Sequence, residues 1–396
     1  DLHSFPTRRS SDLHIVAIDG RVAQLDLPAW LSVARDTRSQ GTRAPLRVDL
    51  SADTLDIAGR AFADAKLTAR EEDDRTQLDI AAPALAGSVL VPHDVTEDSP
   101  VRVALERLEL PAARPDATPG QLVAWLAPAA VIEADAFTWG DRRLGRLTAS
   151  LRANDERVRI DEVRVAGATH SVQGAAQCVP TLDACRLDMD VTSSDVAQTL
   201  RDFALADDVS APSGRLSVEL DWRRRADRPW LASLTGKLAF TLEDGIVRSV
   251  AQAEPPFAPF AMPALLAQNA GVDPDPVSGS PPEFGFARLE AAYELRDGNA
   301  YTSNLHLDGG TEILARGRVG LIDRDYDQVA WVLQGEERLP AAVRRFGATP
   351  QVAAAWLRLR DWLGASEPPE SRAVLHLHGS WARPIVGSPA HEEVTP

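Results

Sequence analysis

The sequence has little lysine, little cysteine and no long apolar run, and each shortage excludes a class of protein. Lysine occurs only at Lys66 and Lys237, and the formal net charge is −16. Without a stripe of cations the chain cannot neutralise nucleic-acid phosphates, so we expect no nucleic-acid partner. No stretch approaches the roughly 18 consecutive apolar residues that a membrane-spanning helix needs.

Known catalytic motifs are missing as well. The sequence contains no GxSxG, HExxH or P-loop motif, and no GxGxxG followed by a suitable helix. His376 and His378, two residues apart in LHLHG, would share one face of a strand, but no third metal ligand accompanies them. The sequence therefore predicts no enzyme, no cofactor and no bound metal.

The two cysteines, Cys178 and Cys185, lie close together in AQCVPTLDACRLD. If two strands fold back across this turn, the thiols lie opposite each other and can form a cross-strand disulfide. Such a bond would indicate an oxidising compartment. Two separate buried thiols are the alternative, and the spacing excludes a CxxC redox or zinc motif.

Apolar residues recur at every second position in short bursts, which is typical of strands with one buried face. Hairpin-type dipeptides such as Asp244-Gly245 and Asp297-Gly298 separate the bursts. The pattern predicts a mainly β fold built on a long antiparallel sheet. The clearest bursts are Leu46-Val48-Leu50, Val101-Val103-Leu105, Val163-Val165, Leu187-Met189-Val191, Leu216-Val218-Leu220-Trp222, Leu238-Phe240-Leu242, Leu305-Leu307 and Val329-Trp331-Leu333.

Helical patterns are few and short, and one long segment fits neither a helix nor a strand. Residues 254–284 are rich in proline, which interrupts a strand ladder because it lacks the N–H donor. We expect this segment to be an excursion with one short helix. The predicted order is a repeating β-groove over residues 14–253 with short helices near 28–37 and 193–205, this excursion, a β region over 285–387 with a helix near 350–364, and a disordered tail over 388–396.

The sequence also contains an internal repeat. ADTLDIAGRAFADAKLTAR, which starts at Ala52, aligns with ADAFTWGDRRLGRLTASLR, which starts at Ala134. LGRLTASLRANDERVRIDEVRVAG from Leu144 aligns in turn with FARLEAAYELRDGNAYTSNLHLDG from Phe286. A hairpin-rich module used at least three times predicts stacking along one axis, where each module covers its neighbours.

The first residues, DLHSFPTRRSSDL, differ from the rest of the chain. They show no strand or helix periodicity, and when back-translated they resemble a common sequencing-library adapter read in frame. A natural disordered tail is the alternative. We expect residues 1–13 to lie outside the fold, and the natural N-terminus, with any membrane anchor, to be missing from this chain.

An antiparallel sheet with one apolar face needs a cover for that face. The predicted helices are too few and too short to cover so many strands. Either two sheets pack into a dry sandwich, or one sheet curls into a trough whose apolar lining holds acyl chains. An error of one residue in the register would move every residue assigned to the trough to the opposite face of the sheet. On the trough hypothesis the lipid-binding residues are Leu216, Val218, Leu220, Leu238, Phe240, Leu242, Leu289, Tyr293, Leu305 and Leu307.

Several segments resemble AsmA-like proteins of Gram-negative bacteria, in particular the C-terminal region of the large YhdP-type members. They are IDGRVAQLDLPAWL from Ile18, AFTWGDRRLGRLTASLR from Ala136, and LEDG from Leu242 followed by the long segment from Phe286 to Gln328. The closing LHLHGSWARPIV, with Gly379, Trp381 and Pro384, is similar to the signature that ends that family.

This resemblance implies a repeating β-groove, a half-barrel with a few short helices, in a periplasmic protein anchored to the inner membrane. It implies a conduit that carries phospholipid from the inner toward the outer membrane, with a membrane at each end of the full-length protein. The alternative is a periplasmic structural or assembly factor that binds protein partners by its groove or by a sheet edge. The sequence does not identify any protein partner.

Overall fold

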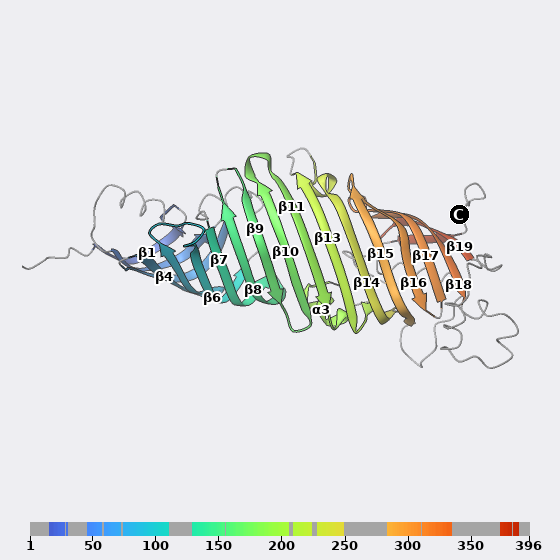
Figure 1. Ribbon diagram of the computed structural model, residues 1–396, viewed down its shortest axis with the longest axis horizontal. Helices are drawn as coiled ribbons and strands as arrows, with labels where there is room; N and C mark the ends of the chain where they lie inside the picture. The colour runs from blue at the N-terminus through green and yellow to red at the C-terminus, as the bar shows by residue number, and fades with distance from the viewer. Residues whose placement is uncertain are drawn as a thin grey trace, which may run out of the picture. The chain divides into compact units, whose positions relative to one another are not determined.

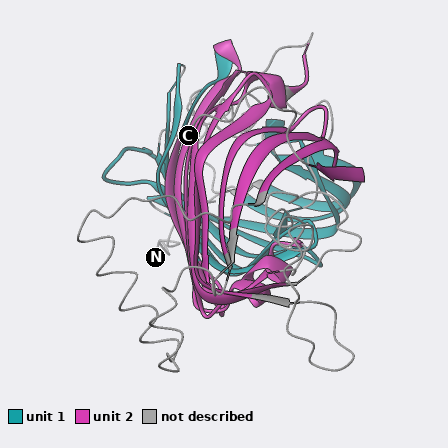
Figure 2. Ribbon diagram, turned by 90° about the vertical axis from the view of Figure 1, so that its right-hand side faces the viewer, with its two compact units in different colours: residues 1–165, 177–181 teal, residues 166–176, 182–396 magenta. Residues whose placement is uncertain are grey.

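The structure is a computed structural model whose twenty strands belong to one mixed sheet that is not closed into a barrel (Figure 1). The chain divides into two compact units, unit 1 with residues 1–165 and 177–181 and unit 2 with residues 166–176 and 182–396 (Figure 2). The prediction of a mainly β fold built on one long sheet is confirmed, but the sheet is mixed and not antiparallel throughout. The residues described are 16–27, 29–30, 46–57, 59–72, 74–110, 129–154, 156–205, 209–223, 228–248, 283–309, 311–334, 373–381 and 383–387.

Unit 1 contains two parallel strand pairs that alternation alone did not predict. Strand β1 runs parallel to β2 and β6 runs parallel to β7, whereas the ladders from β2 to β6 are antiparallel. A parallel pair needs a crossover of a dozen or more residues, and residues 27–45 and 111–128 supply that length. The strands up to the border of the units are β1 (Val16–Asp26), β2 (Leu46–Ile57), β3 (Arg60–Glu71), β4 (Arg75–Ala82), β5 (Leu85–Pro92), β6 (Val101–Leu110), β7 (Ala129–Trp139), β8 (Arg142–Ala153) and β9 (Val158–Ala166).

The repeat in the sequence is also a repeat of structure. Strand β3 begins at Arg60 and β8 begins at Arg142, the two residues that the alignment superposes. The aligned Phe62 and Leu144 are both buried, with 3% and 6% of their surface exposed. In both copies a crossover joins two parallel strands and a hairpin follows, so the same pattern of burial builds the same local topology twice.

In unit 2 the strand pairs from β11 to β20 whose register is described are antiparallel. Figure 2 shows the strands of this unit as an arched sheet. The α-helix α3 (Val196–Asp202) and the short 3-10 helix η2 (Trp230–Ser233) interrupt its strands. A second 3-10 helix, η1 (Pro180–Leu182), and the last residues of β10 fall at the boundary between the two units in the sequence. The strands are β10 (His170–Val179), β11 (Ala184–Ser193), β12 (Val209–Ser210), β13 (Ser213–Arg223), β14 (Thr235–Arg248), β15 (Glu283–Arg296), β16 (Asn299–Gly309), β17 (Thr311–Gly320), β18 (Asp325–Gln334), β19 (Ala373–Ser380) and β20 (Arg383–Gly387).

Each unit has one apolar core cluster on one face of its strands. In unit 1 the cluster is centred on Leu55 and Leu67, which are 0% and 1% exposed. In unit 2 it extends from α3 and β12 across β14–β19 and includes Leu289, Leu305 and Leu377, each at most 1% exposed. Alternate residues of the same strands carry the charges, as expected for a sheet with one buried face.

The prediction for β18 was wrong about which face is buried. Val329 and Trp331 are only partly buried, and the fully buried residues are Ala330 and Val332. The register pairs Val332 with Ile313, which places the smaller apolar residues in the core. Both faces of β18 carry apolar residues, so alternation could not decide between them.

Most predicted helices fall outside the described residues. Helix α3 is shorter than predicted, because it begins at Val196 and not at 193 and ends at Asp202 and not at 205. The described strand β15 begins at Glu283, just before the predicted end of the proline-rich excursion. Predictions for 1–13, 350–364, 388–396, most of 28–37 and most of 254–284 lie outside the described part of the chain.

The assignment of the buried face makes a first prediction. Leu289→Ala should lower the free energy of unfolding by about 2–5 kcal/mol, because it leaves a cavity in a core residue that is 1% exposed. Leu314→Ala, on the opposite face and 37% exposed, should cost less than about 1 kcal/mol. Urea unfolding of both variants measures the difference, and equal losses would contradict the assigned face.

Candidate functional site

The candidate site is the apolar face of unit 2, which we define as the face of β11 and β13–β19 that carries the core cluster. Register brings the predicted residues of neighbouring strands side by side. Leu216 pairs with Phe240, and Leu238 pairs with Tyr293. All ten residues predicted from the sequence to line a groove lie on this face: Leu216, Val218 and Leu220 on β13, Leu238, Phe240 and Leu242 on β14, Leu289 and Tyr293 on β15, and Leu305 and Leu307 on β16.

Exposure changes along the apolar face. On β15 and β16 the face is closed, with Leu289, Leu305 and Leu307 exposed by only 1%, 1% and 2%. On β13 and β14 it is more open, because Leu216 and Leu238 are only half-buried. A small apolar molecule can therefore reach the face most directly at the half-buried strands.

Sequence reasoning missed part of this open section. Met189 on β11 pairs with Val218, and Val191 pairs with Leu216, so the apolar face continues onto β11. Both residues are half-buried, as is Leu187. Their alternation was visible in the sequence, but the pairing of β11 with β13 across α3 and β12 was not.

The opposite face of these strands is charged. Arg215, Glu219 and Asp221 alternate with the apolar residues of β13 and are exposed. Farther along the sheet, Arg318 donates two hydrogen bonds to the carboxylate of Asp325, at 3.0 and 2.7 Å. These bonds raise the pKa of the guanidinium group of Arg318. The two faces therefore differ sharply in polarity.

Helix α3 packs at one end of the apolar face. Val196 belongs to the core cluster and Leu200 packs against it, while the backbone N–H of Val196 donates to the carbonyl of Ala211 at 3.0 Å. The helix is capped at its N-terminus by Asp195, whose carboxylate accepts a hydrogen bond from the N–H of Gln198. The helix therefore contributes apolar side chains to the end of the face.

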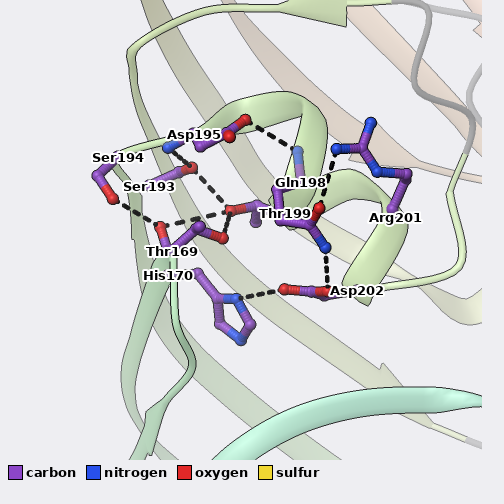
Figure 3. A network of polar contacts seen from close by, with 9 residues as sticks. All are labelled: Thr169, His170, Ser193, Ser194, Asp195, Gln198, Thr199, Arg201 and Asp202. Carbon is purple, nitrogen blue, oxygen red and sulfur yellow. Dashed lines mark hydrogen bonds and ion pairs between the residues drawn. The ribbon is translucent and has the colours of Figure 1, made fainter.

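A polar network holds α3 in place (Figure 3). The hydroxyl of Thr199 lies 2.8 Å from that of Ser193 and 3.1 Å from that of Thr169. Nδ1 of His170 lies 3.6 Å from the carboxylate of Asp202. These contacts tie the helix to the ends of β10 and β11.

The network contains a serine, a histidine and an aspartate, but its geometry is that of an anchor. The imidazole of His170 is fully buried and packs edge to face against the ring of Phe203, with 5.0 Å between the ring centroids. Its Nε2 edge lies so close to Gly167 that a Cβ at that position would collide with the ring. The hydroxyls of the network bond to one another and to the backbone carbonyl of Thr169. His170 therefore packs against the C-terminal end of α3 and helps to hold the helix in place.

The two cysteines, Cys178 and Cys185, are disulfide-bonded in the structure. They flank η1, the turn that joins β10 to β11. Cys185 is 8% exposed and lies on the same face as Met189 and Val191. The bond therefore fixes the start of β11, the strand that extends the apolar face.

The closing segment connects β19 to β20: Gly379 on β19 pairs with Pro384 on β20, and Trp381 lies in the turn between the strands. Gly379 has φ +90°, a conformation that glycine adopts readily and other residues rarely do. The indole N–H of Trp381 donates to the carbonyl of Asp325 at 3.2 Å. Pro384 lies on the short strand β20, where the missing N–H donor is tolerated at a sheet edge. This segment closes the C-terminal end of the core cluster.

The described residues contain neither a membrane-spanning helix nor a metal-binding cluster. Within the described residues no helix is long and apolar enough to cross a membrane. Among the same residues, no group of three or more His, Cys, Asp or Glu side chains has the arrangement of a metal site. His376 and His378 stack on each other at 4.9 Å, and Nε2 of His376 lies 3.0 Å from Asp327.

Comparison with known proteins shows a family for this chain. A family model described as YhdP protein matches residues 5–386, nearly the whole chain. The match begins inside the N-terminal stretch that resembles an adapter. No curated protein and no solved structure matches the chain.

The disulfide gives a second prediction. Replacing both cysteines by serine should lower the free energy of unfolding by about 2–3 kcal/mol. Without the bond, a small closed loop no longer restricts the unfolded chain, so the unfolded state gains conformational entropy. Urea unfolding measures the change. Adding a reductant to the wild-type protein should reproduce the unfolding midpoint of the double variant, and an unchanged midpoint in both would show that the bond is absent in solution.

Proposed function

The chain belongs to the YhdP family, and from that premise we propose that it is a segment of a conduit for phospholipids. Acyl chains lie along the apolar face of unit 2, and the charged face remains in water. The conduit works in the periplasm, in a full-length protein anchored to the inner membrane that carries lipid between inner and outer membrane. The chain performs no catalysis in this role.

One observation carries the proposal: the apolar face is continuous across eight strands but is not uniformly covered. Half-buried Leu216 and Leu238 pack against the core cluster that contains fully buried Leu289 and Leu305, and half-buried Met189 lies on the neighbouring strand β11. The α-helix described in full, α3, packs at the end of this face and does not cover its length. Exposed apolar surface of this kind usually marks a binding site, and alkyl chains match it because they need no hydrogen-bond partner.

A protein-binding role in envelope assembly is the second candidate, and the sheet edge supports it. Strand β20 is short, and its Ile385 is 54% exposed. An edge strand can receive a strand of another chain. This reading predicts a bound protein where the conduit predicts bound lipid, so the tests below separate the two.

A photo-crosslinking amino acid at position 238 tests lipid contact directly. Leu238 is half-buried on the apolar face, so after expression in the periplasm the adduct should contain phospholipid, identified by mass spectrometry. Phe240 and Leu307 are poorer positions, because they are 5% and 2% exposed.

The neighbouring Ala239 is the matched control. It lies on the same strand, is exposed and faces the opposite side of the sheet. Lipid should label position 238 and not position 239. Equal labelling at both positions, or a protein adduct alone at 238, would contradict the conduit.

A charge on the apolar face should also expel lipid. Leu216→Arg places a cation among apolar side chains, and we expect about tenfold or more loss of co-purified phospholipid because burying an unpaired charge is costly. Ser217→Arg puts the same charge on the exposed face and should leave the lipid content unchanged. Extraction and mass spectrometry measure both. Retention of lipid by Leu216→Arg would argue against this face as the binding surface.

A further inference from the structure

The apolar face of unit 2 is crossed by one row of polar residues. Register aligns Tyr293 on β15 with Thr302 on β16, Thr302 with Gly317 on β17, and Gly317 with Gln328 on β18. We call these four residues the polar row. The two neighbouring rows toward Leu289 are apolar throughout: Phe240, Ala291, Leu305, Ala315, Ala330 and Leu375, and then Leu242, Leu289, Leu307, Ile313 and Val332.

Two members of the polar row are buried without a hydrogen-bond partner. Gln328 is 1% exposed, and neither its Oε1 nor its Nε2 has a partner. The hydroxyl of Tyr293 is likewise buried and without a partner, in a residue that is 5% exposed. Such groups are rare in folded proteins, and each requires a physical explanation. Apolar side chains of the same size would fill these positions without the penalty.

The absence of a side chain at Gly317 makes room for Gln328. Gly317 has no side chain, and the side chain of Gln328 passes close over it, with Cγ only 3.1 Å from where a Cβ at 317 would lie. Thr302, on the other side of Gly317, is satisfied by Asn304, whose backbone N–H donates to its hydroxyl at 3.3 Å. Tyr293 follows on the next strand, with its ring stacked on Phe240 at 6.5 Å.

The surroundings of the row are neutral. The rows of residues on either side of the polar row consist of apolar residues and Tyr326. Burial raises the pKa of the hydroxyls of Tyr293 and Tyr326 above their usual range, so both remain neutral. The charged side chains of these strands, such as Arg318 and Glu294, lie on the opposite face. A phosphate would find no cation here to balance its charge. A neutral hydrogen-bonding group suits the row.

We propose that the polar row binds the ester groups of a diacyl lipid, with Tyr293 and Nε2 of Gln328 donating hydrogen bonds to ester carbonyl oxygens. This inference rests on the proposed function, because the acyl chains would lie on the apolar rows beside the polar row. An ester carbonyl is neutral and accepts hydrogen bonds, and it joins directly to an alkyl chain. Because Gln328 and Tyr293 are only 1% and 5% exposed, the side chains around the row must move for a lipid to reach them.

The test compares an ester lipid with its ether analogue, which has the same alkyl chains and headgroup but no carbonyl oxygens. The purified chain is equilibrated with equal amounts of dioleoyl phosphatidylethanolamine and its diether analogue, and the bound lipids are quantified by mass spectrometry. Wild-type protein should prefer the ester lipid by about 2- to 10-fold, the effect of one or two hydrogen bonds. Gln328→Met and Tyr293→Phe should each reduce the preference.

Controls separate this role from a structural one. Leu314→Met alters the opposite face of the sheet, outside the proposed binding surface, and should keep the ester preference. Gln328→Met should leave the thermal midpoint unchanged or raise it, because it removes a buried group without a partner. A lower midpoint in both Gln328→Met and Tyr293→Phe, with unchanged ester preference, would indicate internal water held by the row and overturn the proposal.

Failure of this inference is distinguishable from failure of the proposed function. If wild-type protein binds both lipids equally, the conduit is supported and the assignment of the polar row is overturned. If it binds neither lipid, the proposed function itself is contradicted. A preference that persists in both variants would place the ester-binding group elsewhere on the chain and would also overturn the assignment.

Discussion

The structure depends on one constraint: a sheet whose residues alternate between apolar and charged cannot leave its apolar face in water. In unit 2 this face is closed at the C-terminal strands, where Leu377 and Ala330 are 0% exposed. Toward β13 and β11 the same face becomes half-buried at Leu216 and Met189. The gradient matters for function, because the closed strands give stability and the half-buried strands leave apolar surface that a ligand can cover.

Continuity of the apolar face requires local departures from regular pairing. Between Thr302 and Leu305 strand β16 holds an extra residue, so both side chains face the core although they are three positions apart. Asn304 compensates for the disrupted ladder, because its side-chain oxygen accepts the backbone N–H of Ala292 at 3.0 Å. Gly236, with φ +143°, allows β14 to approach the backbone of Glu219 where a Cβ would collide. These devices let a curved sheet keep one side apolar.

The sequence predicted which residues of most strands share a face, but it did not predict which strands pair or in what register. Alternation placed Leu216, Val218 and Leu220 together because neighbours two apart share a side. It failed at β18, where Val329 and Trp331 are apolar and yet lie on the outer face, since only the pairing with β17 determines which side is buried. The parallel pairs of unit 1 were equally hidden, because the sequence does not show which strands the long crossovers bring side by side. Register depends on contacts distant in sequence, and a single sequence does not contain that information in readable form.

The polar row gives the apolar face a property that a purely apolar surface lacks. On a uniformly apolar wall an alkyl chain has no preferred position along its length, since the hydrophobic effect is non-directional. A few buried hydrogen-bonding groups give a position at which the junction between chain and headgroup is favoured. In the proposed ester site, the neutral groups of Gln328 and Tyr293 would hold that junction by short-range hydrogen bonds and not by charge, and the lipid would be positioned without being trapped. Weak, local binding of this kind is what a surface along which lipids move requires.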